Sequence, residues 1–174
     1  NIHIAAQYSS VINGRNQERQ KIQTSIINTI NNSVEDNQNL INFFYDPTWH
    51  IGVLGIIAGR LMRSNKRPSF VMTDSENFIV GSGRSLGGLN IGTLMMEAAD
   101  KGIIIKGGGH TKACGFTLEK KSWEPFKLFL LDKFTGSTII QENFYELLLD
   151  LTLINNNLLN DLNLLSPFGQ NNPE

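Results

Sequence analysis

Three consecutive glycines followed by a histidine, Gly107, Gly108, Gly109 and His110, form the most distinctive short motif of this sequence. Glycine lacks a Cβ, so such a segment can adopt positive φ and bring backbone N–H groups close to a ligand. An imidazole adds one N–H donor, or a charge when protonated. We therefore expect these four residues to bind a phosphate. The alternative is a glycine-rich strand-to-helix turn in which the histidine only packs.

A second glycine-bounded segment, residues 81–88, places two hydroxyls beside one guanidinium. Arg84 offers a planar fork that matches two oxygens of a phosphate, and Ser82 and Ser85 flank it. We predict that all three bind a phosphate; the alternative is a hairpin end with a surface arginine. The Gly-x-x-x-x-Gly-Lys-Ser/Thr pattern of nucleotide-binding P-loops is absent from the segment.

His50 follows Trp49 directly before a predicted helix. The first turn of a helix carries free N–H donors, so His50 at that position is a candidate anion ligand. Capping of the helix or simple packing is an equally good interpretation of this histidine, and Trp49 could belong to the core.

Other catalytic chemistries receive less support. The histidines His3, His50 and His110 lack a close metal-ligand spacing, so we expect no metal site in this chain. A triad of Ser85, His110 and Asp132 is compatible with their order, but no Gly-x-Ser-x-Gly sequence marks a nucleophile.

The composition limits the class of protein. The 174 residues, 40% hydrophobic and 18% charged, are enough for the core of one domain and part of a second. A formal net charge of -1 provides no overall basic field, so any polyanion site must be local. The single cysteine, Cys114, excludes an internal disulfide and fits a reducing cytosol. No apolar run is long enough to span a membrane.

The first thirty or so residues have the apolar periodicity of one long amphipathic helix. Its polar middle carries Arg15 and Arg19 one turn apart on the same face, and we take both as candidate substrate contacts. The alternative is a solvated connector helix.

Strands that alternate with helices of about ten residues predict an α/β domain with a mixed sheet flanked by helices. The expected strands are 40–45, 69–73, 78–81, 103–106 and 113–118, and the expected helices are 51–62, 91–101 and one that starts after Ser122. A change of composition at residue 138 indicates a second small unit, with a strand at 139–149, a helix at 158–165 and a loop at 166–174.

Taken in order, five segments resemble the C-terminal half of the RecJ family, bacterial single-strand-specific exonucleases of the DHH phosphoesterase superfamily. They are residues 16–20, 49–58, 81–85, 107–115 and 167–174. The glycine motifs are shared across the superfamily, whereas the last segment is specific to RecJ. Asn171 stands where the family usually has glycine.

The resemblance implies three parts: a connecting helix at 1–36, a DHH-associated substrate-binding domain at 37–136, and the start of an oligonucleotide-binding module at 137–174. It also implies that catalysis uses two Mn²⁺ or Mg²⁺ ions in an N-terminal DHH domain, whose Asp-His-His motif this chain lacks. Ser82, Arg84 and Ser85 would then hold a phosphate near the 5′ end of the strand. The segment from Gly107 to His110 would close on the scissile phosphate.

The expected protein is therefore the substrate-binding half of a metal-dependent exonuclease that degrades single-stranded DNA from 5′ to 3′ in DNA repair and recombination. We expect the given sequence to be a piece of a longer chain and to be inactive alone. We expect a monomer in the bacterial cytoplasm, without membrane contact, that binds single-stranded DNA. Single-strand-binding protein or a helicase is a candidate partner. The alternative is a nucleic-acid or nucleotide binding module of another DHH phosphodiesterase or of a synthetase.

Overall fold

A computed structural model describes residues 2–33, 40–135 and 149–168. The chain forms two compact units, Asn1–Gln141 and Glu142–Glu174. The three domain boundaries expected from the sequence stay a prediction. No helix among the described residues is both long and apolar enough to cross a membrane.

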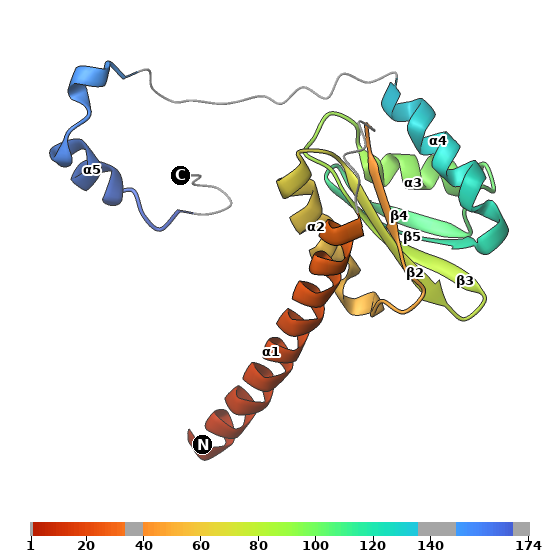
Figure 1. The fold of residues 1–174 in the computed structure, drawn as a ribbon, viewed down its shortest axis with the longest axis horizontal. Helices are drawn as coiled ribbons and strands as arrows, with labels where there is room; N and C mark the ends of the chain where they lie inside the picture. The colour runs from red at the N-terminus through yellow and green to blue at the C-terminus, as the bar shows by residue number, and fades with distance from the viewer. Residues whose placement is uncertain (1, 34–39, 136–148, 169–174) are drawn as a thin grey trace. The chain divides into compact units, whose positions relative to one another are not determined.

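The chain begins with one helix of 32 residues, α1 (Ile2–Ser33), as the apolar periodicity predicts. A helix of this length extends about 48 Å, and Figure 1 shows its first part projecting from the sheet. Residues 3–21 are exposed on all sides, whereas Ile26 and Ile30 are buried against the second helix. Only the last third of α1 is therefore anchored by hydrophobic packing.

A five-stranded mixed sheet in the order β1-β2-β3-β5-β4 forms the centre of the first unit. The pair β1–β2 is parallel, and the other three pairs are antiparallel. The strands are β1 (Asn42–Tyr45), β2 (Ser69–Ser75), β3 (Phe78–Arg84), β4 (Lys106–His110) and β5 (Ala113–Glu119). The predicted α/β class with a mixed sheet flanked by helices is confirmed.

Helices cover both faces of this sheet (Figure 1). A short 3-10 turn, η1 (Ile51–Val53), leads into α2 (Leu54–Asn65), which packs with the end of α1 on one face. Helices α3 (Ile91–Asp100) and α4 (Trp123–Thr135) cover the other face, and η2 (Lys120–Ser122) precedes α4. Two separate hydrophobic cores result, one on each side of the sheet.

The strands extend further into both glycine segments than the sequence predicts: β3 runs to Arg84 and β4 to His110, whereas residues 85–88 lie after β3. Gly81 and Gly83 belong to the central strand β3, and the glycine run forms most of β4 at the sheet edge. The strand predicted at 103–106 is wrong, because β4 starts only at Lys106 and runs through the glycines. Packing is the physical reason: a Cβ at Gly83 would lie 2.6 Å from Phe70 Cε1, so no side chain fits there.

The second unit contains η3 (Leu151–Leu153) and α5 (Asn156–Asn163). The side chain of Asn155 caps α5 by accepting hydrogen bonds from the N–H groups of Asn157 and Leu158. The predicted helix is present but begins two residues earlier than expected. Residues 139–148 of the predicted strand, and the end of the predicted loop, lie outside the described residues.

Close packing at Gly81 gives a test of the fold. A Cβ there would lie 2.3 Å from Phe116 Cζ and 2.8 Å from Met72 Cγ, both in the core under α3 and α4. We expect Gly81→Ala to lower the free energy of unfolding by about 1 to 3 kcal/mol, the usual cost of overpacking. Urea denaturation followed by circular dichroism measures this.

Gly108→Ala is the matched control, because a Cβ at Gly108 meets nothing within 4 Å. Equal denaturation midpoints for Gly81→Ala and Gly108→Ala would contradict the packing that we describe around β3.

Candidate phosphate-binding site

The sheet register places predicted site residues from distant parts of the chain on one face. Arg84 of β3 pairs with Ala113 of β5, which pairs with His110 of β4. Directly opposed residues of neighbouring strands present their side chains on the same face. Arg84 and His110 are therefore two strand spacings apart, about 10 Å, on the face that α2 covers in part.

The next row on this face lies beside the row of Arg84, Ala113 and His110, and its two glycines form an open floor. Here Ser82 pairs with Gly115, which pairs with Gly108. Gly115 is exposed although β5 lies inside the sheet, because neither glycine has a side chain and α2 packs over β2 and β3. A ligand can approach the backbone closely at such a place.

The side chain of Arg84 runs along α2 beside two glycines. A Cβ at Gly59 would lie 3.9 Å from Arg84 Cγ, and one at Gly55 would lie 2.9 Å from Arg84 Nη2. The missing side chain at Gly55 is therefore what makes room for the guanidinium. This role of Gly55 is not predicted from the sequence, although two glycines one turn apart within a helix are a signal that could have indicated it.

Hydrogen bonds fix the Arg84 guanidinium and the neighbouring hydroxyl. Arg84 Nη1 donates to Gly83 O at 2.9 Å and to Ser82 Oγ at 3.1 Å. Ser82 Oγ in turn donates to Cys114 O at 3.0 Å. In the described part of the chain, no carboxylate pairs with Arg84. Its positive charge is therefore held in place and left uncompensated, as an anion site requires.

Ser85 has a different environment from Ser82 and Arg84. Its side chain is buried, its hydroxyl donates to Gly87 O at 3.3 Å, and the N–H of Gly87 lies 3.4 Å from the same oxygen. The N–H of Ser85 donates to Lys112 O. Ser85 therefore braces the turn after β3.

His110 ends strand β4 and is exposed. The peptide before it is tightly packed: Gly109 has φ +155, and a Cβ at Gly92 of α3 would lie 2.5 Å from the carbonyl carbon of Gly109. The backbone of α3 thus rests directly on the backbone of β4. This contact fixes the position of His110 at the edge of the open floor.

The structure places His50 in a separate groove between α1 and the turn before α2. Its Nδ1 accepts a hydrogen bond from the N–H of Gly52 at 3.1 Å, so His50 caps η1, one of the alternatives left open by the sequence. The groove is also lined by Lys21 and Trp49. With Nδ1 used as an acceptor, Nε2 carries the proton of the neutral ring and is the remaining donor.

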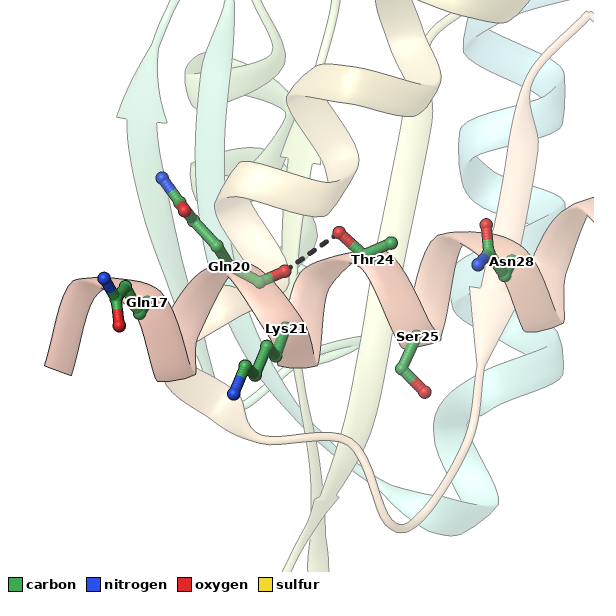
Figure 2. A pocket seen from close by; sticks show the side chains of 6 residues that line it. All are labelled: Gln17, Gln20, Lys21, Thr24, Ser25 and Asn28. Carbon is green, nitrogen blue, oxygen red and sulfur yellow. Dashed lines mark hydrogen bonds between the residues drawn. The ribbon is translucent and has the colours of Figure 1, made fainter. Parts of the chain in front are cut away.

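Arg15 and Arg19 are exposed on α1, before the residues that pack on α2. Arg19 Nη2 donates to Asn16 Oδ1 at 2.6 Å. Figure 2 shows a polar strip on the same helix, in which the hydroxyl of Thr24 donates to the carbonyl of Gln20. The strip consists of Gln17, Gln20, Lys21, Thr24, Ser25 and Asn28. The described structure gives these two arginines no contact with the open floor.

Among the residues that the structure describes, no three His, Cys, Asp or Glu side chains come together as a metal site would require. The described residues therefore do not fit a two-ion centre. The chemistry that they do support is electrostatic binding of a phosphate by Arg84, whose guanidinium is held by Ser82, with His110 as a further donor.

Comparison with known proteins identifies the family to which this fold is similar. Residues 36–135 match the model of the DHHA1 domain. The single-stranded-DNA-specific exonuclease RecJ of Bacillus subtilis is 31% identical over 98% of this chain and 22% of its own length. The same protein from Escherichia coli is 36% identical over 49% of this chain and 15% of its own length.

The fold is also similar to a solved structure. RecJ from Thermus thermophilus in complex with Mn²⁺ aligns with a TM-score of 0.71 and 25% identity, covering 91% of this chain and 24% of that chain. The chain thus spans less than a quarter of the length of each of these relatives.

Cys114, beneath the site, gives a prediction about reactivity. Burial raises the pKa of its thiol to about 12, although the nearby Arg84 charge acts in the opposite direction. At pH 8 we expect alkylation by iodoacetamide to be about a thousandfold slower in the native protein than in guanidinium chloride, since the thiolate is the reactive form. Mass spectrometry over time measures both rates. Equal rates would show that Cys114 is accessible and ionised in the native protein.

Proposed function

This chain belongs to the DHHA1 domain family, and we propose that it is the substrate-binding part of a single-stranded-DNA-specific exonuclease. Its predicted resemblance to RecJ is confirmed by the sequence relatives and by the similar fold. The observation that carries the proposal is the Arg84 guanidinium, which no described carboxylate pairs with, beside the open floor of Gly108 and Gly115. His110 lies on the same face of the sheet, two strands away from Arg84.

The geometry favours contact with the nucleic-acid backbone over reading of the bases. A floor of Gly108 and Gly115 lets a phosphate come close to the sheet, and Arg84 supplies a fork for two of its oxygens. Contacts of this type position a strand without reading its sequence. We therefore propose that Ser82 and Arg84 hold one phosphate of the strand, with the Ser82 hydroxyl turning from Cys114 O to the phosphate. Ser85 supports both by bracing the turn.

His110 is proposed to contact a different phosphate from Arg84. The Arg84 guanidinium lies at Gly55 of α2, whereas His110 is exposed at the sheet edge two strands away. We assign Arg84 to a phosphate near the 5′ end and His110 to the scissile phosphate. His110 would donate a hydrogen bond as negative charge develops on the phosphoryl oxygens.

The whole protein is proposed to act as a 5′-to-3′ exonuclease in DNA repair and recombination, as a cytoplasmic monomer, with single-strand-binding protein or a helicase as partner. Two Mn²⁺ or Mg²⁺ ions held outside the described residues would generate the attacking water. The boundaries at 1–36, 37–136 and 137–174 are proposed as its connecting helix, DHH-associated domain and oligonucleotide-binding part.

The central test is the binding of a labelled oligo-dT strand by the 174-residue chain without metal. We expect Arg84→Gln to weaken binding equally for oligo-dT and mixed sequences. The slope of log K against log salt should become shallower by roughly 0.7, because one phosphate contact of a single strand is lost. Fluorescence anisotropy at several KCl concentrations measures both.

Lys127→Gln is the matched control, because Lys127 lies on α4, which covers the opposite face of the sheet. An unchanged slope in Arg84→Gln, together with a lower unfolding midpoint, would mean that Arg84 only braces β3. Competition by mononucleotides as strong as by oligo-dT would favour a nucleotide-binding module instead.

A second test concerns hydrolysis. Since the described residues contain no metal-binding cluster, we expect the purified chain to release no mononucleotides from a 5′-labelled single strand with Mn²⁺. Gel electrophoresis of the products measures this, with Bacillus subtilis RecJ as the positive control. Metal-dependent release by the chain itself would show that it carries its own catalytic centre.

A further inference from the structure

Helix α2 aligns a second arginine with Arg84. Gly55, Gly59 and Arg63 are spaced by four residues and so lie along one side of the helix. The position of a Cβ at Gly59 is 3.8 Å from Arg63 Nη1 and 3.9 Å from Arg84 Cγ. The guanidinium of Arg63 and the aliphatic stem of Arg84 therefore both lie next to Gly59, while the head of Arg84 lies one turn away at Gly55.

The charged residues of α2 and of the two positions after it are all positive. Helix α2 contains no Asp or Glu, and Arg60, Lys66 and Arg67 lie within one turn of Arg63 in the sequence. Within the described residues, no carboxylate pairs with Arg63 or Arg84. Like charges at such close range repel each other, and a bound anion relieves this repulsion.

We propose that Arg63 binds the phosphate next to the one held by Arg84, so that the two arginines grip two successive phosphodiester groups along α2. This inference rests on the proposed function. The head of Arg84 lies at Gly55 and that of Arg63 at Gly59, a separation of one helical turn, about 6 Å. Neighbouring phosphates of a nucleic-acid strand are separated by a distance of the same order. The ligand class is thus a single strand with at least two consecutive phosphodiesters.

A purely structural role for Arg63 makes a different prediction. Arg63 lies in the last turn of α2, where a positive charge is stabilised by the helix dipole. If that were its role, its removal would lower the unfolding midpoint and leave the salt dependence of binding unchanged. The two roles are therefore separated by measuring both quantities.

The experiment compares Arg63→Gln, Arg84→Gln, the double variant and Lys127→Gln in the 174-residue chain, with labelled oligo-dT and no metal. We expect each single arginine variant to make the slope of log K against log salt shallower by roughly 0.7, because one phosphate contact is lost. The double variant should make the slope shallower by roughly 1.4, because it loses contacts with two different phosphates. Lys127→Gln should keep the wild-type slope. Thermal unfolding followed by circular dichroism should give similar midpoints for Arg63→Gln and the wild type.

A wild-type slope in Arg63→Gln would overturn this inference and leave the proposed function intact if Arg84→Gln still responds. A double variant no different from Arg84→Gln would show that both arginines share one phosphate, which also overturns it. A shallower slope of log K against log salt in Lys127→Gln would show that removing any positive charge changes the salt dependence. That result too would overturn the inference. A wild-type slope in both single arginine variants would reject the proposed function itself.

Discussion

The candidate site depends on the alternation of side chains along strand β3. Gly81 and Gly83 face the core under α3 and α4, where Phe116 and Phe70 occupy the space that their side chains would need. Because successive residues of a strand point to opposite faces, Ser82 and Arg84 must then face α2. A shift of one residue would bury the guanidinium among phenylalanines, at a large cost in desolvation. The core therefore fixes where the charge is presented.

Glycine has three different structural roles around this site. In β3 it allows aromatic rings to pack against the backbone, and in α2 Gly55 leaves room for the head of Arg84. Across β4 and β5, Gly108 and Gly115 leave the sheet open to a ligand. The same lack of a Cβ thus builds the core on one face and an accessible floor on the other. A nearly neutral chain can in this way present a strong local positive charge.

The contacts behind the site explain why its donors are well positioned. Ser82 links the guanidinium of Arg84 to the backbone of β5, and α3 rests on the backbone beside His110 through Gly92. A site on packed strands loses less conformational freedom on binding than one on loops, so more of the interaction free energy remains for binding. By contrast, the exposed arginines of α1 are held only by their own helix.

The sequence alone determined most of the secondary structure, the α/β class and the residue types of the site, because periodicity and side-chain chemistry are local properties. It identified α1 to within a few residues, and it selected Arg84 and His110 as candidate phosphate donors. It placed most of both glycine segments after the strands, because glycine in a single sequence indicates a turn even where close packing within a strand excludes a side chain. Only the tertiary structure decided that Arg84 and His110 share one face, that Ser85 is buried, and that Gly55 accommodates the guanidinium. These facts depend on strand register and on contacts between distant segments, which no local pattern encodes.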